Sequence, residues 1–153
     1  MINKAKAVVK GGLLYPDING TVLFTQFRDG VEINVKIHNL PAFSRADGKA
    51  VGPFGFHIHN GKSCEIGTID DQFPLSGTHY NPGDRPHGDH AGDFPVLMPM
   101  SDGTAMMKFT SDKFLVSDIM GLTVLIHESP DDYRTEPAGN SGEKIACGVI
   151  TPF

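Results

Sequence analysis

The chain of 153 residues is long enough to bury one hydrophobic core, and we expect a single domain over residues 1–153. A net charge of -5 excludes a general nucleic-acid binder, which needs a clustered Lys/Arg face, and no apolar run is long enough to span a membrane. Residues 1–10 lack the apolar core of a signal peptide, so the sequence as written predicts a cytoplasmic protein. A removed leader would instead make it secreted or periplasmic.

Short β-strands are the expected secondary structure, because 18 glycines and 11 prolines interrupt the chain frequently. The clearest strand is 31–38, where every second residue from Val31 to Ile37 is apolar. Asp29-Gly30 is typical of a hairpin turn that pairs this strand with residues 21–27. In chain order, the expected strands are residues 4–10, 21–27, 31–38, 54–60, 94–98, 104–110, 122–127 and 145–151. Such a series of short strands predicts an all-β sandwich or barrel.

Three long stretches, residues 41–53, 60–95 and 128–144, have no regular pattern. Long loops in a compact domain are usually functional or held in place by another group. All histidines except His38 lie between His57 and His127, within or beside these loops. His38 falls on the polar face of its strand, and we expect it to be exposed and without a role.

The histidines of two expected strands share an outward direction. In the segment His57-Ile58-His59, the strand period of two places both imidazoles on one face. The apolar face of residues 122–126 likewise leaves His127 pointing away from the core. The sequence therefore predicts a metal site on the outer wall of the sandwich, under the long loops. A set of merely exposed strand histidines is the alternative.

A second group of ligand-type residues lies in one loop rich in glycine and proline. His79, His87 and His90 occur there with several carboxylates. Three imidazoles and one carboxylate form a closed four-coordinate shell for Zn²⁺, whereas imidazoles alone suit Cu²⁺. A solvated histidine-rich loop remains the alternative.

Cys64 and Cys147 are the two cysteines of the chain. Their wide separation is unlike the close pairs of a thiolate metal site, and it favours a disulfide over the alternative of two buried free thiols. The lack of a visible signal peptide argues in the opposite direction, because disulfides are uncommon in the cytosol.

Taken in order, these motifs resemble the copper,zinc superoxide dismutase family over nearly the whole chain. The matching segments are Gly55-Phe56-His57-Ile58-His59, His79-Tyr80-Asn81-Pro82, His87-Gly88, His90-Ala91-Gly92-Asp93, His127-Glu128, Gly139-Asn140 and Ala146-Cys147-Gly148-Val149-Ile150. The resemblance implies an all-β, Greek-key, eight-stranded β-sandwich or barrel of immunoglobulin-like architecture. It also implies long metal-binding and electrostatic loops.

The resemblance assigns both metals and their neighbours to particular residues. Copper is expected at His57, His59, His79 and His127, and zinc at His79, His87, His90 and Asp93. His79 would bridge the metals, and Asp131, with Asp132 as the second choice, would hydrogen-bond one histidine of each site. The resemblance also implies a Cys64–Cys147 disulfide, which some cytosolic members keep.

The implied reaction is dismutation of the superoxide anion to dioxygen and hydrogen peroxide, with His79 delivering a proton. Lys144 stands where the family has an arginine beside copper; it keeps the charge but lacks the planar fork, so we expect reduced activity. Ala138 replaces a threonine that narrows the channel in many members, so anion selectivity is expected to be looser. His79 and Lys144 are therefore the expected catalytic residues.

Loop lengths resemble those of bacterial members, and residues 60–62 depart from the animal pattern at a segment that contributes to the animal dimer. We therefore expect a monomer or a homodimer of a different kind. Two other functions are considered: a non-enzymatic relative that delivers or buffers copper, and a β-sandwich recognition module whose histidines are incidental.

Overall fold

The computed structural model describes residues 3–46 and 48–153. Within these ranges the chain forms nine β-strands and two short 3₁₀ helices. The strands are β1 (Lys4–Gly11), β2 (Asn19–Phe27), β3 (Gly30–His38), β4 (Ser44–Ala46), β5 (Lys49–Val51), β6 (Phe56–His59), β7 (Ala105–Ser111), β8 (Thr123–His127) and β9 (Lys144–Pro152). The helices are η1 (Pro74–Ser76) and η2 (Val116–Ile119).

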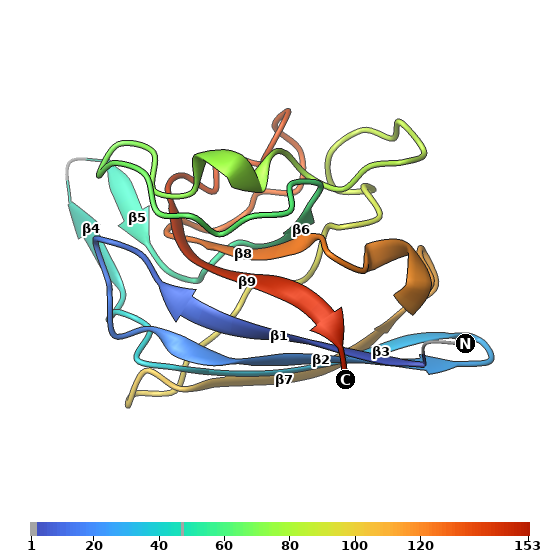
Figure 1. The fold of residues 1–153 in the computed structure, drawn as a ribbon. Coiled ribbons are helices and arrows are strands. Elements are labelled where there is room, and N and C mark those ends of the chain that lie inside the picture. The colour runs from blue at the N-terminus through green and yellow to red at the C-terminus, as the bar shows by residue number, and fades with distance from the viewer. Residues whose placement is uncertain (1–2, 47) are drawn as a thin grey trace.

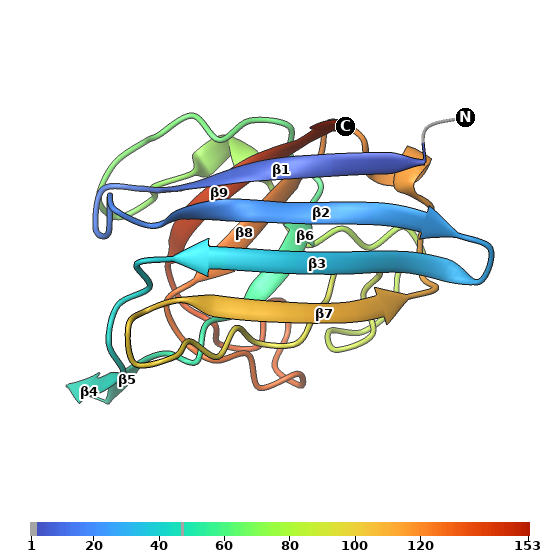
Figure 2. The same ribbon diagram turned by 90° about the horizontal axis from the view of Figure 1, so that it is seen from below.

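The main antiparallel sheet, of order β6-β8-β9-β1-β2-β3-β7, curls into two layers, and β4 and β5 form a small sheet of their own. Strands β1, β2, β3 and β7 form one layer, and β9, β8 and β6 form the other (Figure 1). Figure 2 shows the first layer face-on, with β1 and β7 at its two sides. Between β3 and its neighbour β7 the chain visits the other layer at β6, which is a Greek-key crossover. The predicted all-β Greek-key class is confirmed.

The hydrophobic core fills the space between the two layers. Because side chains alternate along a strand, Val22 and Phe24 of β2 and Ile33 of β3 point into the core from the first layer. Ile58 of β6 and Val124 of β8 point into it from the second layer, which consists of β6, β8 and β9. All five side chains are fully buried. The other faces of β6 and β8 are thereby left to carry the histidines.

One predicted strand is wrong. Residues 94–98 make only an isolated bridge, between Leu97 and Phe54. Pro95 and Pro99 have no N–H group, so a ladder cannot extend in either direction from Leu97. Every other predicted strand is present, although β6 is shorter than residues 54–60.

Two smaller expectations also change. The stretch 41–53 contains the hairpin β4–β5 and is not wholly irregular. His38 is half-buried and not exposed, with its Nδ1 3.5 Å from the hydroxyl of Thr104.

Residues 60–93 and 128–143 lie over the outer face of β6, β8 and β9 (Figure 1). The predicted disulfide between Cys64 and Cys147 is present and ties the first loop to β9. In the described ranges, no helix has the length and apolar character needed to cross a membrane.

Candidate metal centre

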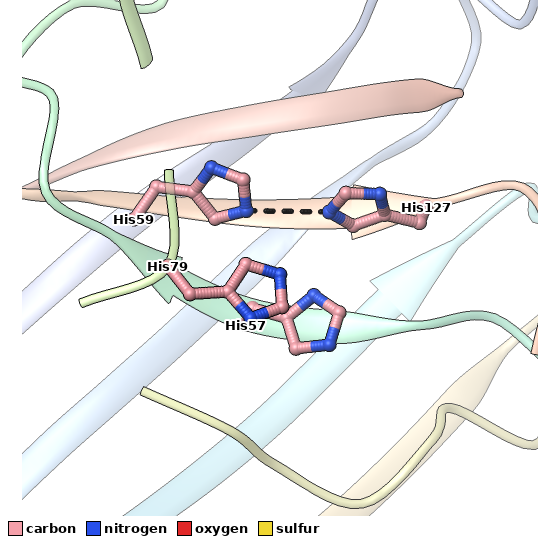
Figure 3. Close-up of side chains that lie close together, drawn as sticks. All are labelled: His57, His59, His79 and His127. Carbon is pink, nitrogen blue, oxygen red and sulfur yellow. Dashed lines mark hydrogen bonds between the residues drawn. The ribbon is translucent and has the colours of Figure 1, made fainter. Parts of the chain in front are cut away.

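Four histidines converge on the outer face of the layer formed by β6, β8 and β9 (Figure 3). They are His57 and His59 from β6, His127 from β8, and His79 from the first loop, residues 60–93. One ring nitrogen of each lies within 4.8 Å of those of the others. The Nε2 atoms of His59 and His127 face each other at 3.3 Å, and the rings of His57 and His79 stack at 4.0 Å. All four are buried, although the sequence places them on the outer side of the sheet.

Short backbone contacts bring the first loop against β6. His79 forms an isolated bridge with His59, and Asp93 forms one with His57. The backbone oxygen of Ile58 accepts a hydrogen bond from Tyr80, and its amide donates to Gly92. A Cβ on Gly92 would lie 2.5 Å from that oxygen, so only glycine permits the close approach. These contacts place loop histidines beside strand histidines.

Each strand histidine is oriented by a hydrogen bond from the ring nitrogen that points away from the other histidines. His57 donates from Nε2 to Asp131 Oδ2 at 2.6 Å. His59 donates from Nδ1 to the carbonyl of Gly77 at 2.9 Å, and His127 from Nδ1 to the carbonyl of Gly142 at 3.1 Å. These bonds fix the tautomers and leave the inner nitrogens as lone-pair donors.

A second tetrad consists of His79, His87, His90 and Asp93, and it shares His79 with the first. The Nδ1 atom of His79 lies 3.0 Å from Asp93 Oδ1 and 3.2 Å from Nδ1 of His90. Asp93 Oδ2 accepts hydrogen bonds from the amides of Gly88 and His90, which fix the carboxylate. His79 therefore presents Nδ1 to this tetrad and Nε2 to the other.

Asp131 lies between the two tetrads. Its Oδ1 accepts from Nε2 of His87 at 2.7 Å, while its Oδ2 accepts from His57. Gly139 packs directly on this carboxylate, with a backbone φ of +66° and no room for a Cβ. Asp132, the second choice from the sequence, is exposed and bonds instead to residues 134 and 135.

The electrostatics favour neutral imidazoles at the three strand histidines and an ionised carboxylate at Asp93. Burial lowers the pKa of His57 and His59 well below the usual range and that of His127 to about 4, and neighbouring imidazoles act in the same direction. Burial opposes ionisation of Asp93, but the hydrogen bond from His79 and the nearby imidazoles lower its pKa. The strand histidines thus offer neutral nitrogen lone pairs, and Asp93 offers a negatively charged oxygen.

Three buried imidazole nitrogens, His57 Nδ1, His79 Nε2 and His87 Nδ1, have no hydrogen-bond partner among the described residues. An unsatisfied buried polar atom costs about 1–3 kcal/mol, so such a cluster needs a partner other than protein. All three atoms point into the tetrads. Three imidazoles with a carboxylate match a Zn²⁺ shell, and four imidazoles match Cu²⁺. The residues present therefore fit both metals.

Lys144, the first residue of β9, pairs with His127 in the ladder. Its Nζ is half-buried and donates to residues of the first loop, and burial lowers its pKa while Asp71 partly opposes this. Ala138 lies on the wall of a cavity of about 620 Å³, together with His79, His90 and Arg85. Lys144 does not line that cavity.

Sequence reasoning missed the two carbonyls that orient His59 and His127. Backbone groups leave no side-chain signature in a sequence. The available signal is that both carbonyls belong to glycines that follow a serine, Gly77 and Gly142, each with a positive φ.

Comparisons with known proteins agree with this geometry. The family model described as Copper/zinc superoxide dismutase (SODC) matches residues 18–150. A "Superoxide dismutase [Cu-Zn]" of Deinococcus radiodurans is 32% identical over 150 residues, covering 87% of this chain and 77% of that protein. One of Legionella pneumophila is 36% identical over 133 residues, covering 86% and 76%. The solved "Cu/Zn superoxide dismutase from Brucella abortus" superposes with a TM-score of 0.77 at 25% identity, over 95% of this chain and 98% of that one. The chain belongs to the copper/zinc superoxide dismutase family.

Proposed function

We propose that this protein dismutates superoxide to dioxygen and hydrogen peroxide at a copper–zinc pair. The observation that carries the proposal is the pair of buried tetrads that share His79 and contain nitrogens without a protein partner. The alternative of copper delivery or buffering is not favoured, because every ligand of both tetrads is kept. A recognition module with incidental histidines is not favoured either, since these side chains are buried.

The orienting hydrogen bonds support an assignment of each ligand atom. Copper would be held by His57 Nδ1 and by Nε2 of His59, His79 and His127. Zinc would be held by Nδ1 of His79, His87 and His90 and by Asp93 Oδ1. Copper supplies a one-electron couple when bound, taking an electron from one superoxide and returning it to a second.

His79 is the proposed proton donor. Its Nε2 faces the copper tetrad and has no protein partner among the described residues, while its ring lines the 620 Å³ cavity. The lone pair of this nitrogen can bind copper or a proton but not both, so it would take up a proton from solvent only while it is not bound to copper and could then deliver that proton to superoxide as it is reduced to peroxide. Asp93 and Gly92 support this position by fixing the loop that carries the ring.

Lys144 places a positive charge next to His127, and the expected attraction of the superoxide anion rests on that charge. The loss of the threonine side chain at Ala138 supports a wider channel wall at that point. Both assignments are testable by substitution.

We further propose one domain over residues 1–153, supported by the curled seven-stranded sheet whose strands run from Lys4 to Pro152.

The Cys64–Cys147 disulfide supports the secreted or periplasmic alternative, because disulfides form mainly in oxidising compartments. Cell fractionation tests the compartment. Sedimentation tests the expected monomer or non-animal-type homodimer.

The deciding experiment is to load the purified full chain with copper and zinc and to measure dismutation and metal content on the same sample. We expect high activity at about one copper and one zinc per chain, the stoichiometry of two tetrads. Zinc retention without copper and without activity would overturn the proposal in favour of a metal-handling role.

A further inference from the structure

Lys144 is held by three acceptors that surround one end of helix η1. Its Nζ donates to the Ser76 hydroxyl at 2.8 Å, the Gly77 carbonyl at 3.1 Å and the Phe73 carbonyl at 3.3 Å. Phe73 precedes the helix and Gly77 follows it. A cation at the C-terminal end of a helix is also favoured by the exposed carbonyls there.

An ammonium group has three N–H donors, and here each has a protein acceptor. Lys144 can therefore donate a hydrogen bond to an anion only by giving up one of these contacts. An arginine has five N–H donors in a planar fork and could keep the loop contacts with donors to spare. The lysine charge remains, but its hydrogen-bonding capacity is used by the protein itself.

One of the acceptors also holds a copper-tetrad histidine. The carbonyl of Gly77 accepts from Nδ1 of His59 at 2.9 Å and from Nζ of Lys144 at 3.1 Å. A carbonyl oxygen has two lone pairs, so it can serve both donors. The carbonyl cannot be repositioned freely, because the backbone on both sides of it is hydrogen-bonded: the Thr78 carbonyl accepts from the amide of Asn60, and the Ser76 carbonyl accepts from that of Gly61. Lys144 thus connects β9 to the ring of His59.

The backbone of Lys144 is fixed beside another histidine of the copper tetrad, His127. Lys144 pairs with His127 across β8 and β9. Cys147, farther along β9, is bonded to Cys64 of the same loop. Strand β9 therefore holds the loop at two points, of which Lys144 is the one next to the tetrad.

We infer that Lys144 is a positioning residue for His59, acting through the Gly77 carbonyl, and not a hydrogen-bond donor to superoxide. The inference rests on the proposed function only in that His59 binds copper. This role accounts for a lysine that does not line the 620 Å³ cavity, because its contacts hold residues 73–77 and, through Gly77, the ring of His59.

The test compares Lys144→Met, Lys144→Arg and Ser76→Ala in the copper- and zinc-loaded protein. Lys36→Met, which removes an exposed lysine from the other layer, is the charge control. The readouts are the Cu²⁺ electron paramagnetic resonance spectrum, copper affinity by chelator competition, and solvent exchange of the His59 Nδ1 proton in protein with zinc in both tetrads. Dismutation is measured alongside over a range of ionic strength.

For Lys144→Met we expect an altered copper spectrum, copper affinity lower by about tenfold and faster exchange of the His59 proton. Lys144→Arg should restore all three, Ser76→Ala should shift them less in the same direction, and Lys36→Met should leave them unchanged. If Lys144→Met does not fold, Ser76→Ala alone decides, because it keeps the charge. Wild-type spectra, affinity and proton exchange in both Lys144→Met and Ser76→Ala, or in Ser76→Ala alone in that case, would overturn the inference. Copper binding by the wild type without dismutation would overturn the proposed function while leaving this test intact.

Discussion

Asp131 accepts a hydrogen bond of 2.6 Å from Nε2 of His57, a residue 74 positions earlier in the chain. The other oxygen of the same carboxylate accepts one of 2.7 Å from His87. His57 belongs to the proposed copper tetrad and His87 to the proposed zinc tetrad. One buried carboxylate therefore fixes the ring orientation in both, and a change at Asp131 should be felt by both metals.

Asp131→Asn should lower the affinity for copper and for zinc by about 10–100-fold each. An amide has one oxygen and one NH₂ group, so one of the two imidazole N–H groups would face a donor, and the other would keep an acceptor that no longer carries a negative charge. Chelator competition for each metal measures the effect. Asp132→Asn is the matched control, since Asp132 is exposed and its carboxylate accepts hydrogen bonds from residues 134 and 135, away from both tetrads. Equal affinities in the two variants would contradict the role of Asp131.

Cys64→Ser combined with Cys147→Ser should lower the free energy of unfolding by about 4–5 kcal/mol in the chain-entropy model. The reason is the large loop that the disulfide closes, with 83 positions between its ends. Urea unfolding of the oxidised wild type and the double variant gives the difference. The reduced wild type should resemble the double variant. A difference below about 1 kcal/mol would show that the unfolded chain gains little entropy on cleavage.

The strand pattern was predictable because each strand buries one face. Val22 and Phe24 in β2 and Ile33 in β3 are buried at alternate positions, and the same period turns His57 and His59 away from the core. The failure at residues 94–98 has a local cause: an apolar segment around Leu97 resembles a strand, but the flanking prolines prevent a ladder. Alternation alone could not reveal this.

The site was predictable in composition but not in its supports. Histidine and aspartate side chains can be recognised in the sequence as candidate metal ligands. Every residue has a backbone carbonyl, so the sequence cannot show that those of Gly77 and Gly142 orient His59 and His127. Long-range packing decides the rest. Lys144 could be assigned a charge from the sequence, but its three acceptors lie 67 to 71 positions away and are visible only in the fold.

Single histidine substitutions should separate the two tetrads. His127→Ala removes a ligand from the first tetrad alone, so dismutation and copper binding should be lost while zinc stays bound. His90→Ala removes a ligand from the second alone, so zinc affinity should fall first. Metal analysis after dialysis, with the dismutation rate, measures both. His38→Ala, on the opposite layer, is the control and should match the wild type; retained activity in His127→Ala would contradict the proposed copper shell.

Tyr15 lies between β1 and β2 and contacts Glu128, the residue that follows His127. Its hydroxyl donates to Glu128 Oε2 at 2.8 Å, while Lys49 pairs with Oε1 at 2.7 Å. Burial, together with the hydrogen bond and the charge of Glu128, raises the pKa of Tyr15 from 10.0 to about 12. Since the folded state favours the protonated phenol, this contribution to stability is complete below pH 10 and is lost as the pH rises through 12.

Tyr15→Phe should therefore lower the free energy of unfolding by about 1–3 kcal/mol at pH 8, because the buried Glu128 carboxylate loses a donor. The difference between wild type and variant should shrink as the pH rises from 10 towards 12, because the wild-type phenol then ionises. Urea unfolding across this range gives the difference, and absorbance near the phenolate band counts the tyrosines that titrate late. A difference that stays constant up to pH 12 would show that the Tyr15 proton does not contribute to folding, since linkage requires the two curves to converge.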